Sequence, residues 1–314
     1  MTTAVASETV VQNRRSLLVA ELVLLGVALI WGINIPVIKT GLEQMDWYSL
    51  NAVRLTVSAV ILGVLGWLER RRGIIPASNL GWTPILIFAV FISLLYQIFF
   101  LVGVSRTASG TTSLILATIP MWTALIASAF LKDKLHLLAW TGLVVAFVGT
   151  VIVGLDKPSG SAAAISSGSR LAGTLAILGA AVSWAAGTVC SRPLMKSISP
   201  IQLSAWAAAI SLPVHLALAA PTFSKSVSAL RQPSVWAVVL YSGIFSTGLA
   251  LPMWNFGVRR AGAAQAAIFQ NLVPVIAIAS AWLMRSETIS VGQILGGVLI
   301  IGGLITMRTT RPNP

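Results

Sequence analysis

Long apolar runs alternate with short polar segments along this chain, and each run is about as long as a membrane-spanning helix. A helix needs about 20 mainly apolar residues to cross roughly 30 Å of hydrocarbon. By that rule the pattern predicts ten spans, at residues 17–38, 47–68, 82–103, 107–130, 136–154, 171–192, 200–220, 235–257, 263–284 and 288–307. The runs are too long and too uniformly apolar for the alternating strands of a membrane barrel, so we predict an all-α polytopic membrane protein.

Composition supports this class and weakens one alternative. Hydrophobic residues make up 56% of the chain and charged residues only 9%, whereas a soluble domain has about 25% charged residues. The net charge of +13 could suggest a nucleic-acid partner. Because the basic residues punctuate apolar runs instead of clustering on one face or arm, we expect no nucleic acid. The single cysteine, Cys190, excludes an intrachain disulfide.

The distribution of Lys and Arg predicts the orientation in the membrane. With the N-terminus in the cytoplasm, 13 of the 21 Lys and Arg fall on the cytoplasmic side, 7 fall on the other side, and Arg54 lies within a span. This bias predicts that both termini are cytoplasmic. Arg14 and Arg15 before the first run resemble part of an export signal, but nine further apolar runs follow, so we interpret the first run as a retained helix.

The chain also repeats itself at an offset of 154 residues. At this offset Gly103, Val104, Arg106, Pro120, Asp133, Gly142 and Gly149 match Gly257, Val258, Arg260, Pro274, Glu287, Gly296 and Gly303, and Trp31 matches Trp184 at an offset of 153. We therefore expect two five-helix repeats, in residues 1–155 and 171–314, with residues 156–170 as a linker rich in Gly, Ser and Ala. Five is odd, so the two repeats must be inverted relative to each other, as in many transporters.

The sequence resembles a known family at these motifs. The two-repeat pattern, "WGINIPVIK" in the first span, and a repeated series of "GV", proline, acidic residue and glycine-spaced final helix resemble EamA-type members of the drug and metabolite transporter superfamily. Within it the chain is similar to YddG-type exporters of aromatic and other neutral amino acids. The chain departs from the family pattern because no proline stands beside Asp133 or Glu287.

The resemblance implies export by alternating access through the bacterial inner membrane. It implies a central cavity lined by the first, third and fourth spans and by their partners, the sixth, eighth and ninth. The expected partners are therefore a small-molecule substrate and the lipid bilayer. Because one chain carries both repeats, we expect a functional monomer.

Uncharged amides and deep aromatic residues in these spans are the candidates for lining the cavity. Amides can hydrogen-bond the carboxylate and ammonium of a zwitterion, and aromatic faces can hold an apolar side chain or an ammonium group. For any single amide the alternative is a structural tie between two helices. The candidates are Trp31, Asn34, Tyr96, Gln97, Phe99, Trp184, Trp254, Asn255, Gln270 and Asn271.

A second set of residues is predicted to bend or pack the helices. Proline inside a helix removes an N–H donor, and we expect Pro36 to break the first helix where it faces the pathway. Glycines seven residues apart share one helix face and permit close packing. The set comprises Pro36, Pro120, Pro274, Gly142, Gly149, Gly296 and Gly303.

Charged residues in the spans bear on how transport is driven. No carboxylate falls at mid-membrane, which disfavours proton exchange through a deep glutamate such as the one that small multidrug antiporters of this superfamily use. Arg54 is the only basic residue well inside a span. We expect it to pair with a helix end or with Asp46, or to snorkel, and not to bind substrate. If this is wrong, an anionic substrate becomes plausible.

Other functions remain as alternatives. A multidrug or organic-cation exporter coupled to the proton gradient would recognise charge instead of an amino-acid backbone. A channel is conceivable, although an inverted repeat favours gated access. His136 and His215 have no metal partner at useful spacing, and no nucleophile, base and orienting acid converge on one helix face. We therefore expect no cofactor, no metal and no enzymatic activity.

Overall fold

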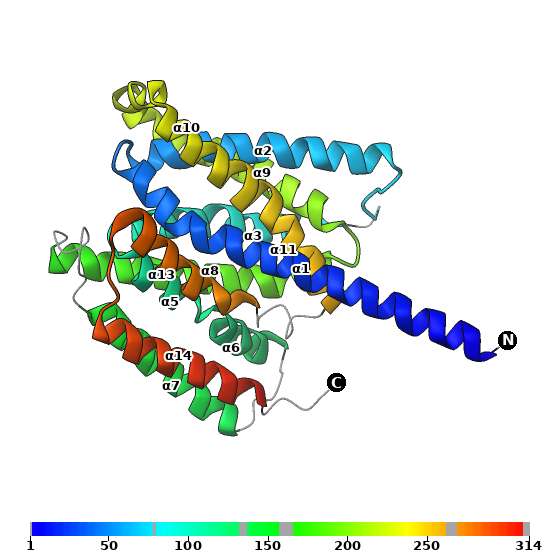
Figure 1. Cartoon of the computed structure of the whole chain (residues 1–314). Helices are drawn as coiled ribbons and strands as arrows, with labels where there is room; N and C mark the ends of the chain where they lie inside the picture. The colour runs from blue at the N-terminus through cyan, green and yellow to red at the C-terminus, as the bar shows by residue number, and fades with distance from the viewer. Residues whose placement is uncertain (1, 78–79, 132–136, 157–165, 262–268, 310–314) are drawn as a thin grey trace.

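The computed structural model describes residues 2–77, 80–131, 137–156, 166–261 and 269–309. Within these ranges the chain forms helices joined by short turns, and no strand occurs (Figure 1). The elements are α1 (Thr2–Leu42), α2 (Trp47–Arg71), α3 (Trp82–Phe88), η1 (Ala89–Leu95), α4 (Tyr96–Val104), α5 (Ser109–Leu116), α6 (Ile119–Leu131), α7 (Leu137–Leu155), α8 (Ser167–Leu194), α9 (Pro200–Ser226), η3 (Ala229–Arg231), α10 (Pro233–Leu240), η4 (Tyr241–Leu249), α11 (Ala250–Ala261), α13 (Leu272–Arg285) and α14 (Val291–Thr309).

The helices agree with a membrane protein of many spans. In the described ranges, seven helical stretches are long and apolar enough to cross a membrane. Three further apolar helices are shorter, at Trp140–Leu155, Leu272–Arg285 and Val291–Thr306. The predicted all-helical class is therefore confirmed, while the count of ten spans stays a prediction. Residues 136 and 263–268 of the predicted spans, and 157–165 of the predicted linker, lie outside the described ranges.

A short turn before α2 fixes this helix against α9. The Oδ1 atom of Asp46 accepts hydrogen bonds from the backbone N–H groups of Tyr48 (3.0 Å) and Ser49 (3.1 Å), which caps α2. Its Oδ2 atom accepts one from the Ser226 hydroxyl at the end of α9 (2.6 Å). Burial acts to raise the pKa of Asp46, but these hydrogen bonds outweigh it and lower the pKa. Asp46 is thus occupied at the turn and is not a partner of Arg54.

The glycine-spaced helices α7 and α14 pack directly against each other (Figure 1). Gly149 lies against Gly296, where an added Cβ atom would stand only 2.6 Å from the opposing carbonyl oxygen, and Gly303 lies against the carbonyl of Gly142. The numbering rises along one helix as it falls along the other, so the two helices run antiparallel. Close helix packing through these four glycines is what their spacing predicts.

Two helices are interrupted just before the repeat-matched prolines. The residues Ala117 and Thr118 form a turn between α5 and α6, and Pro120 occupies the first turn of α6, where its missing N–H costs nothing. In the second half Asn271 forms a turn, and Pro274 lies in the first turn of α13. By contrast α1 continues through Pro36 without a break, so the predicted interruption at that residue is wrong.

Candidate functional site

A central cavity lies between helices from both halves of the chain. It contains about 1020 Å³ of empty space, counting the part that opens to solvent, and its wall is formed by α1, α2, η1, α4, α5, α6, α8, α9, η4, α11 and α13 together with Gln270. The family resemblance implied six spans around the cavity. Two more helices, α2 and α9, also contribute to its wall.

A row of touching aromatic rings lies at this cavity, and all of its members except Trp254 line the wall. The ring of Trp31 meets Trp184 edge-on at 5.4 Å between centroids and lies 5.5 Å from Trp254. Tyr96 lies 4.8 Å from Trp184 and stacks on Phe100 at 5.6 Å. Aromatic pairs at these distances attract each other beyond their simple burial. The rings come from α1, α4, α8 and α11, so both halves of the chain contribute to one aromatic cluster.

Most of the predicted cavity residues lie on its wall. The structure places Trp31, Asn34, Tyr96, Gln97, Trp184 and Gln270 there. Four others do not line it: Phe99 packs against Gly179, the ring of Trp254 contacts that of Trp31, and Asn255 and Asn271 lie outside the lining. Helical periodicity alone could not decide which side of α4, α11 or α13 faces the cavity.

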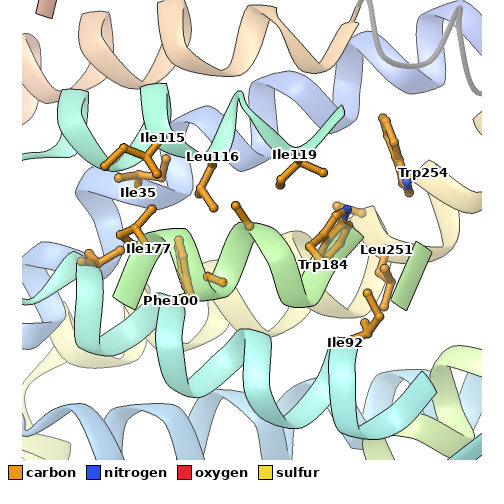
Figure 2. Packing of buried hydrophobic residues seen from close by; sticks show 14 of the residues in the cluster. Ile35, Ile92, Phe100, Ile115, Leu116, Ile119, Ile177, Trp184, Leu251 and Trp254 are labelled. Carbon is orange, nitrogen blue, oxygen red and sulfur yellow. The ribbon is translucent and has the colours of Figure 1, made fainter. Parts of the chain in front are cut away.

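The interrupted helices also form part of the wall. Ala117 and Ile119 line the cavity at the first interruption, and Gln270, Val273 and Pro274 line it at the second. Figure 2 shows Leu116 and Ile119 pointing from this segment toward α8 and Trp184. Non-helical backbone at membrane depth is tolerated where it borders a cavity, and discontinuous helices form the binding sites of many transporters.

Arg54 corrects the expectation drawn from the sequence. Its side chain is 1% exposed and lines the cavity, so it neither pairs with Asp46 nor snorkels to a surface. Its Nε donates to Asn51 Oδ1 (3.1 Å), Nη1 to the Thr247 hydroxyl (3.4 Å), and Nη2 to Gln97 Oε1. All three acceptors are uncharged. The isolated basic residue in an apolar span was the signal for this site.

A hydrogen-bonded chain behind Arg54 fixes its orientation. The Nε2 atom of His215 lies 2.8 Å from the Ser93 carbonyl oxygen, which can only accept, so Nε2 carries the proton. The Nδ1 atom of His215 then accepts from the Asn51 amide nitrogen (3.2 Å), which turns the Asn51 oxygen toward Arg54. His215 and Asn51 are both buried, and neither is among the cavity residues predicted from the sequence.

Two π-helical segments supply backbone acceptors beside the cavity. Ser93 lies in η1 and accepts from His215, while Ser246 lies in η4 and its carbonyl accepts from the indole N–H of Trp31 (3.0 Å). The two serines are 153 residues apart, the same offset that relates Trp31 to Trp184. Short π-helical segments are rare and are frequently found at functional sites.

A buried carboxylate joins three helices near the Lys39 end of α1. Glu287 is 6% exposed, and its Oε1 atom lies 3.1 Å from both Lys39 Nζ and Arg285 Nε. The Ser109 backbone N–H donates to Oε2 (2.8 Å) at the start of α5. Burial acts to raise the pKa of Glu287, but Lys39 and these hydrogen bonds outweigh burial and lower the pKa from its ordinary value. We call these four residues the Glu287 cluster.

Many apolar helices around a cavity with interrupted helices in its wall define the class of multi-pass membrane transporters. The chain belongs to the EamA-like transporter family, whose pattern matches residues 18–155 and again residues 171–309. This confirms the resemblance that the repeated motifs suggested.

Individual relatives agree with this assignment. The chain is 26% identical over 281 residues to the uncharacterized transporter YoaV of Bacillus subtilis (strain 168). This alignment covers 90% of this chain and 94% of the relative. It is 27% identical over 287 residues to a protein of Escherichia coli (strain K12) named "probable amino-acid metabolite efflux pump", with 88% and 91% covered. A solved crystal structure, 18% identical, matches with a TM-score of 0.64 over 93% of this chain and 99% of that one, which supports the fold.

Proposed function

We propose that this protein exports amino acids or related small metabolites from the cytoplasm by alternating access through the central cavity. In this proposal the two family-matched regions are inverted five-helix halves, both termini are cytoplasmic, and the membrane is a bacterial inner membrane. The observation that carries the proposal is the cavity wall, to which both halves contribute an interrupted helix at repeat-matched positions. Exchange of conformation between two such halves opens the cavity to alternate sides of the membrane.

Further observations support the inverted arrangement and the substrate class. The antiparallel packing of α7 on α14, which are repeat-matched helices, is the contact expected near an in-plane pseudo-two-fold axis. The printed name of the Escherichia coli relative supports amino-acid efflux. Because one chain forms the whole cavity wall, we also propose that the monomer is the functional unit.

An organic-cation exporter fits the cavity less well. A cationic substrate would have to enter beside the buried guanidinium of Arg54, and like charges repel strongly where water is scarce. Among the described residues, no carboxylate lines the cavity to balance such a substrate. We therefore favour a substrate that carries a carboxylate.

Counterflow in liposomes tests the proposal. Liposomes with purified protein are loaded with one unlabelled amino acid at a time and given the same labelled amino acid outside, without an ion gradient. We expect saturable uptake that Trp31→Ala removes and that Trp140→Ala, a matched change of an exposed tryptophan on α7, leaves intact. Absence of counterflow for every amino acid, with organic cations moved under a proton gradient instead, would refute the proposal.

A further inference from the structure

Arg54 is a buried charge without a counter-charge. In the part of the chain that the structure describes, the ion pairs join Lys39 or Arg285 to glutamates, and none includes Arg54. Its side chain is 1% exposed, and its hydrogen-bond partners are two amides and one hydroxyl. A buried charge is normally paired, and an ionisable residue inside a membrane protein marks a substrate or ion pathway by default.

The guanidinium still has donors to offer. A guanidinium carries five N–H groups. The three hydrogen bonds to Asn51, Thr247 and Gln97 use one N–H each on Nε, Nη1 and Nη2. Among the described residues, two N–H groups, one on each terminal nitrogen, therefore remain for a further acceptor, and Arg54 lines the cavity. Two terminal N–H groups of one guanidinium are the arrangement that binds a carboxylate.

A second cavity residue has an unsatisfied acceptor. The side-chain oxygen of Asn34 is buried and has no hydrogen-bond partner in the described structure, although Asn34 lines the cavity. An unpaired buried carbonyl costs free energy unless a ligand or water supplies a donor. Asn34 lies on α1, three residues from Trp31, so it belongs to the same face as the aromatic rings.

The cation is present on one side of the cavity only. At the offset of 153 that relates Ser93 to Ser246, Arg54 corresponds to Ala207 and Asn51 to Ser204. The repeat therefore supplies two similar π-helical segments but a single fixed cation. A cavity with one buried cation is suited to one carboxylate, held in one orientation.

We propose that Arg54 binds the carboxylate of the transported molecule and that Asn34 accepts a hydrogen bond from its amino group. The apolar side chain then lies against the rings of Trp31, Trp184 and Tyr96. The substrate class is an α-amino acid with an apolar or aromatic side chain and a free carboxylate. This inference rests on the proposed function. It assigns the carboxylate of the substrate to Arg54 and the amino group to Asn34. His215 and Asn51 are positioning residues, because they act on the substrate only through Arg54.

Ligand binding to the unmutated protein tests the carboxylate requirement without any transport step. Thermal stabilisation of the purified protein is measured with L-phenylalanine, 3-phenylpropanoate, L-phenylalanine methyl ester and 2-phenylethylamine, and with the corresponding leucine set. We expect the free amino acids to bind, and the ester and amine to bind about 10- to 150-fold more weakly, because they lack the charged partner of Arg54. An ester that binds as tightly as its acid, or no binding by any free carboxylate, would overturn the inference.

Variants assign the two polar groups separately. Arg54→Gln should weaken L-phenylalanine and 3-phenylpropanoate equally, and Arg54→Lys should restore part of the loss. Asn34→Leu should abolish only the preference for the amino acid over 3-phenylpropanoate, and Asn34→Asp should increase that preference. Arg170→Gln, a change on α8 outside the cavity lining, serves as the control and should bind as the unmutated protein does.

The two proposals fail in different ways. Carboxylate-dependent binding without counterflow would leave the binding assignment standing and refute export. Amino-acid counterflow with an unchanged KM in Arg54→Gln would leave export standing and refute the role of Arg54. If Arg54→Gln does not fold, the comparison of acids with their esters on the unmutated protein decides the matter.

Discussion

Neutralising Glu287 should open the end of the protein at which the Glu287 cluster lies. Its carboxylate connects Lys39 on α1, Ser109 at the start of α5 and Arg285 at the end of α13. Opening of this end would separate these elements and break the cluster. Glu287→Gln keeps the shape of the side chain but removes the negative charge, so it destabilises only the conformation in which the cluster is closed.

The size of the effect follows from burial. Lys39 is 7% exposed, so loss of Glu287 leaves an ammonium group buried without its partner. Removing one member of a buried ion pair costs about 3–5 kcal/mol. Since about 1.4 kcal/mol corresponds to a factor of ten, the ratio of open to closed conformations should rise by a factor of at least about 100.

Thiol labelling measures this change. The native cysteine is removed with Cys190→Ser, and a probe is placed with Ala108→Cys, a buried position beside Glu287. In Glu287→Gln the probe should react with a water-soluble thiol reagent at least about 100-fold faster than in the parent while the closed conformation still predominates, because its labelling follows the open population.

The matched control is Glu43→Gln. Glu43 also pairs with Arg285 (2.7 Å), but its side chain is 58% exposed. Exposed ion pairs contribute about 0–1 kcal/mol, so this variant should label at nearly the parent rate. If Glu287→Gln labels no faster than Glu43→Gln, the cluster does not hold this end closed and the reasoning is refuted.

Three further predictions concern stability. Because the pKa of Glu287 is lowered in the folded protein, its carboxylate stabilises the fold above the unfolded pKa of about 4.3 and loses this contribution as pH falls through the lowered pKa. The melting temperature should therefore stay level from about pH 8 to 5, drop below about pH 4, and drop less in Glu287→Gln. Asp46→Ala should cost about 1–2 kcal/mol of unfolding free energy by removing the cap of α2, and Asp46→Asn clearly less. Gly296→Ala should lower the melting temperature, because the added Cβ atom would stand 2.6 Å from the Gly149 carbonyl oxygen. Gly302→Ala, on the same helix with nothing within 4 Å, should leave the melting temperature unchanged or raise it. Equal effects of the two changes would argue against the packing role of Gly296.

Local patterns were enough to predict most of the helices. A run of about 20 apolar residues can satisfy its backbone in lipid only as a helix, so the predicted spans overlap the observed helices from α1 to α14. The glycine spacing predicted close helix packing, although not that α7 and α14 pack on each other, and the interrupted helices resume next to Pro120 and Pro274, which were predicted to bend or pack helices. The same reasoning failed at Pro36, because α1 accommodates one missing hydrogen bond without ending.

The sequence pattern predicted several polar residues of the cavity wall, but not the contacts that they make. Arg54 forms hydrogen bonds with Gln97 on α4 and Thr247 on η4. Lys39 pairs with Glu287, which is 248 residues away in the sequence. Periodicity reports which residues share a helix face, but it does not report which neighbour that face meets. Whether a segment forms a helix depends on its own residues and on the surrounding lipid. The charge balance of a cavity depends on side chains that only the packed helices bring together.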